Sequence, residues 1–202
     1  AASDVYKRQH LHSDLVHTVA LYGIAVLGIE PDDVVFSAAK LFFAYGLGNG
    51  MSFPFYVGAT AVLMAERPTP DAVLDVLRRH EPTIYYGVPT LYGAILADPD
   101  NDRRRSSPRL RRCVSAGEAL PEGVGRAWEE RFDVPILEGL GSTEMLHIFL
   151  SNAPGDVRYG TSGKAVPGYS LRLLDDDDTV VTRPGEMGEL CVSGPSSAVA
   201  YW

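Results

Sequence analysis

The chain has 202 residues, of which 46% are hydrophobic and 22% are charged, a composition typical of a globular protein. Its formal net charge of −8 argues against a nucleic-acid partner, because contacts with phosphates require a basic surface. The longest apolar stretch, 19–29, is too short to cross a bilayer, and two distant cysteines, Cys113 and Cys191, do not suggest a disulfide framework. We therefore expect a cytoplasmic protein without a membrane span, with both cysteines buried in strands.

Most of the chain alternates between helix-like and strand-like segments. In chain order we expect a helix at 15–27, a strand at 34–37, a loop leading into a helix at 41–50 and a buried strand at 59–64. A helix at 69–80, a strand at 83–87 and a helix at 89–97 follow, and then a polar surface loop at 98–107. The last elements of this part are a strand at 110–115, a helix at 121–132, and a strand at 135–137 that runs into a glycine-rich turn. This alternation predicts a parallel α/β sheet with flanking helices.

The pattern changes from residue 159 onwards. Short strand-like runs at 170–174, 179–181 and 188–192 predict a small antiparallel β subdomain, barrel-like or sheet-like, with the acidic run 175–178 at a hairpin tip. The arginines at 103–105 are expected to lie on a solvated surface. We therefore divide the chain into a non-native leader at 1–9, which has no apolar periodicity, a partial α/β subdomain at 10–157 and a partial antiparallel β subdomain at 158–202.

One candidate binding segment, 115–121, follows a predicted strand and opens a helix. In open α/β sheets, ligands bind at this edge, where backbone amides are free. Gly117 would allow the backbone to approach a flat ligand such as a nucleobase. An ordinary strand-to-helix turn is an equally good interpretation of this segment taken alone.

A second candidate segment, 138–144, also follows a predicted strand and contains two glycines. Thr143 offers a hydroxyl to a phosphate, and Glu144 offers the hard oxygen ligand that Mg²⁺ prefers. The segment lacks the Gly-Lys-Ser/Thr ending of a Walker loop. A plain turn capped by the threonine is the alternative.

Two apolar segments could complete a site. His147 lies among apolar residues directly after the second segment, where a lone histidine is more often part of the core than a ligand or base. Aromatic residues and glycines at 42–50 can shape a flat apolar pocket. Composition alone favours ordinary core packing for both.

Together these segments resemble the AMP-forming acyl-CoA synthetases, part of the adenylate-forming superfamily that includes luciferases and peptide-synthetase adenylation domains. The motifs that carry the resemblance are Tyr-Gly-Val-Pro-Thr at 86–90, Ser-Ala-Gly-Glu at 115–118, Gly-Ser-Thr-Glu at 141–144, and Gly-Glu-Leu at 188–190 followed by Gly194 and Tyr201. Four motifs in order are far more specific than any one of them, and the likeness covers 10–202. Segments 36–49 and 142–152 are most similar to benzoate-CoA ligases and related aryl-CoA ligases.

The resemblance implies a two-step reaction whose substrates are an aromatic carboxylate, ATP and coenzyme A. The carboxylate attacks the α-phosphate of ATP to give an acyl-adenylate, and the thiol of coenzyme A then displaces AMP. By motif match, the nucleotide would contact Ser115, Ala116, Gly117, Glu118, Ala119, Glu138, Gly139, Leu140, Gly141 and Thr143. The catalytic residues would be Thr143, Glu144 and His147, with Glu144 holding Mg²⁺ and His147 holding the carboxylate by hydrogen bond or by charge. The aryl group would lie against Ala44, Tyr45, Gly141, His147 and Ile148.

Three parts of the family pattern have no counterpart in the chain: the phosphate loop with its lysine, the aspartate that binds the ribose, and the C-terminal domain with its catalytic lysine. We therefore expect an internal fragment with little or no ligase activity alone. A fatty-acyl ligase and a peptide-synthetase adenylation domain are alternatives, although the acidic partner for a substrate amine is not evident. A non-catalytic nucleotide-binding module is the alternative from another class.

Overall fold

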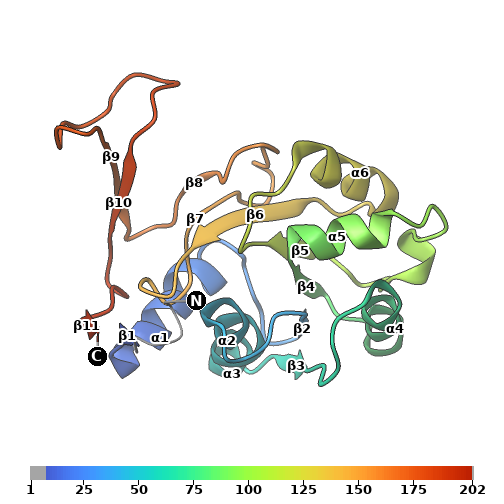
Figure 1. The fold of residues 1–202 in the computed structure, drawn as a ribbon. Coiled ribbons are helices and arrows are strands. Elements are labelled where there is room, and N and C mark those ends of the chain that lie inside the picture. Colours follow the sequence, from blue (N-terminus) through green and yellow to red (C-terminus); the bar gives the residue numbers. More distant parts are fainter. Residues whose placement is uncertain (1–7, 202) are drawn as a thin grey trace.

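Seven strands form a mixed sheet in the order β3-β2-β4-β5-β6-β7-β8 (Figure 1). The computed structural model describes residues 8–201. The strands are β2 (Val34–Ser37), β3 (Thr60–Val62), β4 (Ile84–Gly87), β5 (Arg112–Ser115), β6 (Ile136–Gly141), β7 (Ile148–Ser151) and β8 (Lys164–Ala165). The first five strands in the sheet order are parallel, whereas β7 and β8 are antiparallel to their neighbours. The expected α/β fold is confirmed, with a mixed sheet in place of a purely parallel one.

Helices connect the parallel strands. They are α1 (His12–Thr18), which continues as the π-helical segment η2 (Val19–Ile24), then α2 (Ala44–Leu47), the π-helical segment η3 (Gly48–Ser52), α3 (Phe53–Val57), α4 (Pro70–His80), α5 (Pro89–Leu96), the short 3₁₀ helix η4 (Arg103–Arg105) and α6 (Glu122–Phe132). The Thr69 hydroxyl caps α4 by accepting a hydrogen bond from the Ala72 amide at 3.3 Å. Within residues 8–201, none of the helices is long and apolar enough to cross a membrane.

Both faces of the sheet are buried, and the two cores follow from the alternation of side chains along each strand. In β4, Ile84 and Tyr86 face the core that also contains Tyr22 and Phe53 from the N-terminal helical segments. Their neighbour Tyr85 faces the opposite core, which is built by α4, α5 and α6. Strands covered on both sides must be apolar throughout, which is why they are readily recognised in the sequence.

The C-terminal part forms two small antiparallel sheets. Strands β9 (Ser170–Leu174) and β10 (Glu189–Ser193) make a hairpin that projects from the main sheet, and β11 (Ala200–Tyr201) pairs with β1 (Arg8–Gln9) (Figure 1). The expected strand at 179–181 is wrong, because Val180 forms only one isolated bridge, with Leu174. The chain turns there instead: the Asp175 carboxylate accepts hydrogen bonds from the amides of residues 177 and 179. The acidic run therefore lies in a turn, as expected.

Several expected elements differ from the structure in extent. The segment 59–64 is not a buried strand, because β3 is at the sheet edge and Leu63 is 60% exposed. The strand at 135–137 does not end in a turn, because β6 continues to Gly141 by pairing with β7. The helix expected beyond the loop at 41–50 already begins at Ala44.

The cysteines and the arginine run also differ from their expected settings. Cys113 is buried in β5 as expected, but Cys191 is only half-buried because the β9–β10 hairpin has no layer on its other face in the described residues. Arg103 is not simply solvated: its guanidinium donates to the carbonyls of Phe132 and Pro108 at 3.0 and 3.1 Å. The leader expected at 1–9 lies outside the described residues, except for Arg8 and Gln9.

Candidate active site

Two adjoining cavities lie at the edge where the parallel strands end, the usual ligand-binding edge of such sheets. The first, the edge cavity, has a volume of 170 Å³ and is lined by Phe43, Ala44, Tyr45, Ala116, Gly117, Gly141, Ser142, Thr143, His147 and Ile148. The second, the crevice, has a volume of 250 Å³ and is lined by Gly117, Glu118, Ala119, Glu138, Gly139, Leu140, Gly141 and Ser162. Gly117 and Gly141 line both cavities, so the two spaces meet at these glycines.

The predicted site residues distribute between these cavities in an orderly way. All five residues expected at the aryl group line the edge cavity, and seven of the ten expected at the nucleotide line the crevice. Ser115 lines neither, because its side chain is fully buried beneath the edge. Phe43 and Ser162 were not among the predicted site residues, and Ser162 comes from a loop that carries no recognisable motif.

The junction of the two cavities depends on close packing between β6 and β7. A Cβ atom at Gly141 would lie 2.5 Å from the carbonyl oxygen of His147, a contact with backbone that cannot be relieved by a side-chain rotation. The pairing register also shifts between Leu140 and Gly141. Glycine is therefore required at 141 for the two strands to approach beside the shared wall of the two cavities.

His147 forms the inner wall of the edge cavity and is 2% exposed. Its ring centroid lies 4.5 Å from that of Phe53, 5.1 Å from Tyr22 and 5.8 Å from Tyr45. Burial among these rings lowers the pKa of His147 to about 3, so the imidazole is neutral at physiological pH. A neutral imidazole favours the hydrogen-bonding alternative over the charged one for the predicted role of His147.

The hydrogen-bonding capacity of His147 is only partly used. Its Nε2 atom lies 3.1 Å from Oδ1 of Asn49, which is itself fully buried. Within the described residues, Nδ1 of His147 and Nδ2 of Asn49 have no hydrogen-bond partner. Buried polar atoms without partners are costly, and they are typical of sites that satisfy them with a ligand or water.

Glu138 connects the crevice to the start of α6. Its carboxylate is 4% exposed, and one oxygen accepts a hydrogen bond from the Leu120 amide at 3.1 Å. The other oxygen has no hydrogen-bond partner among residues 8–201. Burial raises the pKa of Glu138, which the Leu120 hydrogen bond only partly offsets. The crevice floor therefore carries a carboxyl group that protonates more readily than an exposed one.

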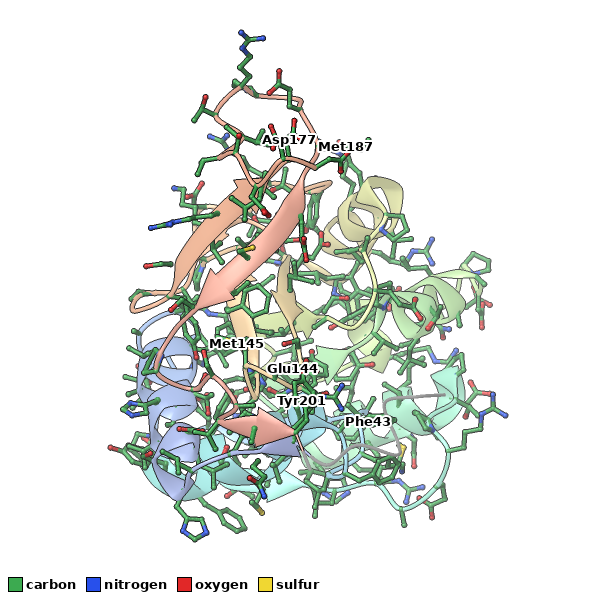
Figure 2. The ribbon with its side chains drawn as sticks, turned by 60° about the vertical axis from the view of Figure 1, so that its left-hand side comes forward. Phe43, Glu144, Met145, Asp177, Met187 and Tyr201 are labelled. Atoms are coloured by element: carbon green, nitrogen blue, oxygen red, sulfur yellow. The ribbon has the colours of Figure 1, made fainter. Side chains whose placement is uncertain are left out.

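Glu144 lies outside both cavities, where β11 crosses the turn after β6 (Figure 2). Its carboxylate pairs with the Arg8 guanidinium and accepts a hydrogen bond from the Tyr201 hydroxyl at 3.2 Å. Partial burial would raise the pKa of Glu144, but the hydrogen bond and charge of Arg8 outweigh it and lower the pKa.

Glu144 fits a magnesium site of the kind that depends on substrate phosphates. Residues 8–201 contain no group of three or more His, Cys, Asp or Glu side chains that could hold a metal by themselves. Mg²⁺ in nucleotide sites usually takes one or two protein carboxylates and completes its shell with water and phosphate oxygens. In this structure the Glu144 carboxylate is engaged by Arg8, so a metal ion would have to replace that contact.

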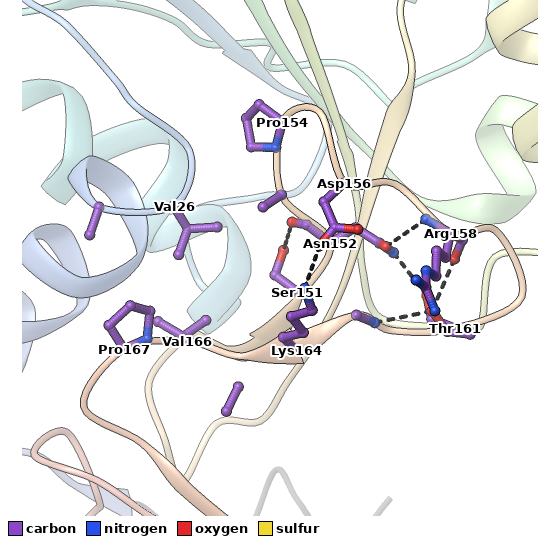
Figure 3. Close-up of a pocket in the computed structure, with 14 residues that line it drawn as sticks. Val26, Ser151, Asn152, Pro154, Asp156, Arg158, Thr161, Lys164, Val166 and Pro167 are labelled. Atoms are coloured by element: carbon purple, nitrogen blue, oxygen red, sulfur yellow. Dashed lines mark hydrogen bonds and ion pairs between the residues drawn. The ribbon is translucent and has the colours of Figure 1, made fainter.

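A larger cavity of 710 Å³ lies elsewhere, between the N-terminal helical region and the β7–β8 hairpin (Figure 3). Val26 lies opposite Val166 and Pro167, and the Asn152 side chain bridges the loop by accepting from the Arg158 amide and donating to the Thr161 carbonyl. None of the predicted site residues lines this cavity. Size alone therefore does not identify the candidate site.

Comparison with known proteins shows the family to which the chain belongs. The sequence model of the family described as AMP-binding enzyme matches residues 9–202. A benzoate–CoA ligase of Thauera aromatica is 68% identical over 193 residues, which cover 96% of this chain and 36% of the relative. The chain thus spans about a third of the length of that relative.

Solved structures show the same similarity in three dimensions. A benzoate CoA ligase from Burkholderia xenovorans superimposes with a TM-score of 0.92 at 55% identity, over 96% of this chain and 39% of that one. The anthranilate CoA ligase AuaEII, in complex with anthranoyl-AMP, gives a TM-score of 0.90 at 44% identity, over 96% of this chain and 37% of that one. The family model matches nearly the whole chain, and the solved structures of similar sequence share its fold. The chain therefore belongs to the AMP-binding enzyme family.

Proposed function

We propose that this chain supplies the aryl-acid pocket and part of the nucleotide site of an ATP-dependent aryl-CoA ligase of the benzoate type. The observation that carries the proposal is that the edge cavity and the crevice lie side by side at the strand edge and share Gly117 and Gly141 in their walls. An acyl-adenylate needs this arrangement, because its acyl group and its adenine lie on either side of one phosphate. The similarity to the benzoate–CoA ligases of Thauera and Burkholderia supports an aromatic acid as the substrate.

The size and chemistry of the edge cavity support an unsubstituted or lightly substituted ring. Its volume is 170 Å³, and an apolar cavity of about 150 Å³ in another protein accommodates benzene. Tyr45 and Ile148 supply apolar walls, and the neutral His147 supplies a polar atom at the inner end. One methylene or hydroxyl in such a pocket changes discrimination by about 1–3 kcal/mol, so a para-substituent is selected by small differences.

In the proposed first step, a carboxylate oxygen of the aromatic acid attacks the α-phosphate and pyrophosphate leaves. The Thr143 hydroxyl donates to an α-phosphate oxygen, and His147 orients the substrate by a hydrogen bond. A magnesium ion held by Glu144 would stabilise the charge that develops on the phosphate oxygens. In the second step, the thiol of coenzyme A attacks the acyl carbon, forming the thioester and releasing AMP. Because both cysteines are free, we also propose a reducing, cytoplasmic setting.

Binding of an adenylate analogue tests the proposal directly. We propose that turnover requires the remaining parts of a full-length ligase, so affinity is measured, with 5′-O-(N-benzoylsulfamoyl)adenosine and its hexanoyl counterpart in isothermal titration calorimetry. We expect the benzoyl compound to bind at least tenfold more tightly, a difference of about 1.4 kcal/mol. Replacing His147 by Ala should remove this preference, whereas His80→Ala, on the exposed surface of α4, should keep it. Equal affinity for both analogues would contradict the proposal.

A further inference from the structure

We propose that His10 and Asp14 form a positioning pair that holds the turn carrying Thr143 and Glu144. Nε2 of His10 lies 2.8 Å from the carbonyl oxygen of Thr143, across 133 positions of sequence. Nδ1 of the same ring lies 3.1 Å from Oδ2 of Asp14, four residues along the chain. The carboxylate is 2% exposed and also accepts a hydrogen bond from the Leu11 amide at 2.9 Å.

Both nitrogens of the His10 ring face oxygen atoms that accept hydrogen bonds. One faces the Thr143 carbonyl and the other faces the Asp14 carboxylate. The two contacts fix the orientation of the ring, so the pair holds the backbone of the turn from the side.

The turn needs such support, because its backbone is strained. Leu146 has φ of +63°, a left-handed conformation that is unfavourable for a bulky side chain. The Thr143 carbonyl that accepts from His10 also accepts from the Leu146 amide at 3.1 Å, so the same acceptor closes the turn. Strained conformations of this kind persist only where the surroundings over-determine them.

Hydrogen bonds from the segment before β11 hold the next two carbonyls of the turn. The Glu144 carbonyl accepts from the Ala198 amide at 2.7 Å, and the Met145 carbonyl accepts from the Ser196 hydroxyl at 2.7 Å. Figure 2 shows Glu144 and Met145 beside the segment that leads to Tyr201. Three successive carbonyls are thus fixed by groups remote in sequence.

The functional consequence rests on the proposed function. The turn carries the hydroxyl and the carboxylate assigned to the phosphate side. Thr143 also lines the edge cavity, but Ala44, Tyr45 and Ile148, which are assigned to the aryl ring, come from other segments. Losing His10 should therefore weaken contacts with the phosphate-like part of a ligand and leave the preference for a benzoyl over a hexanoyl group unchanged. His10 is a positioning residue, because it acts through the Thr143 backbone and lines neither cavity.

Amide hydrogen exchange of the 202-residue chain tests the pair without any ligand. We expect His10→Phe to speed exchange of the Leu146 amide about tenfold or more, as for one lost hydrogen bond. His10→Gln, which keeps one donor, should recover part of the protection. The exposed His12→Phe serves as the matched control and should change nothing.

Unchanged Leu146 exchange in His10→Phe would overturn the pair. Calorimetry then tests the link to function, with an expected tenfold loss of affinity for the benzoylsulfamoyl adenosine in His10→Phe and no loss in His12→Phe. If the unmodified chain does not bind this analogue, the proposed function fails. Hydrogen exchange of the Leu146 amide would still show whether His10 and Asp14 hold the turn.

Discussion

At the scale of single residues, the environment of His147 determines what the site can do. A histidine of ordinary pKa would be partly charged near neutrality and could attract a carboxylate from solution. The rings of Tyr22, Tyr45 and Phe53 remove water from the imidazole and keep it neutral. Under the proposed function, a neutral hydrogen-bonding group suits a carboxylate that must remain nucleophilic, because it orients the oxygen without forming an ion pair.

The buried neutral state of His147 predicts a pH dependence of stability. Since the pKa is lowered to about 3, the unfolded state binds one more proton than the folded state between about pH 6.5 and pH 3. The free energy of unfolding is therefore at its full value, as far as His147 is concerned, above pH 6.5. It falls as the pH is lowered, by about 2 kcal/mol at pH 5. Urea unfolding at pH 7, 6 and 5 should show that loss in the unmodified chain and not in His147→Gln. The exposed His80→Gln should retain it.

Sequence reasoning reached His147 because it follows the Gly-Ser-Thr-Glu motif, but it could not determine its charge state. The three rings that bury it come from segments 94 or more positions away along the chain. The same holds for His10, whose acceptor on Thr143 is 133 positions distant. Protonation states depend on such neighbours, so they are absent from any local pattern.

At the scale of elements, α2 contributes Ala44 and Tyr45 to the wall of the edge cavity, and η3 continues the helical run behind His147. The π-helical turn η3 places Gly48 against His147: a Cβ atom there would lie 2.4 Å from Cδ2 of the ring and 3.0 Å from Phe53. The helix thus approaches the imidazole as closely as a backbone without a side chain allows. Single π-helical turns often occur at functional sites.

Replacing Gly48 by Ala should have two opposing effects on stability, each of known size. Helix propensity alone would stabilise the chain by about 1 kcal/mol, whereas overpacking in a filled core costs about 1–3 kcal/mol. Because the contact at 2.4 Å requires the ring to move, we expect net destabilisation and a weaker preference for the benzoyl analogue. Gly93→Ala in α5 is the matched control, since its Cβ would meet nothing within 4 Å, and it should be neutral or stabilising in thermal unfolding. A more stable Gly48→Ala variant with unchanged specificity would show that the contact is irrelevant.

Strands and helices between 34 and 137 could be predicted because their periodicity is local. The extension of β6 to Gly141 could not, since glycines read as a turn until β7 supplies hydrogen-bond partners. The failed strand at 179–181 has the opposite cause. Its β-branched residues favour a strand, but the preceding acidic turn leaves Val180 48% exposed with a single bridge.

At the scale of the whole molecule, the end of the sheet opposite the site is closed by a buried ion pair. Asp33, 4% exposed, accepts hydrogen bonds from the Arg111 guanidinium at 2.5 and 2.9 Å and from the Thr83 hydroxyl at 2.6 Å. Burial alone would raise the pKa of Asp33, but these hydrogen bonds outweigh it and lower the pKa. The pair connects the N-terminal helical region to the entry of β5, since Arg111 also donates to the Gly28 carbonyl.

Breaking this ion pair should lower the stability of the chain without changing its affinity for a ligand. Asp33→Asn leaves Arg111 without its charge partner, and we expect a loss of roughly 3 kcal/mol, the low end for buried pairs because the arginine is 30% exposed. Because the pKa of Asp33 is lowered, the contribution is present above the unfolded value of about 4 and lost as the pH falls through the folded value. The difference between the unmodified chain and Asp33→Asn in urea unfolding should therefore shrink in acid. Affinity of the folded variant for the adenylate analogue should not change, and a large loss would mean that the two ends of the sheet are coupled.

The sequence by itself determined the alternation of elements, the order of the motifs and the edge at which they meet, because parallel strands place their carboxyl ends together. It thereby located both cavities at the ends of β5 and β6. Only the tertiary structure decided the division into an edge cavity and a crevice, the neutral state of His147 and the contacts of His10 with Thr143 and Asp14. These properties depend on burial and on hydrogen-bond partners that come from distant segments, and no local spacing of residues encodes them.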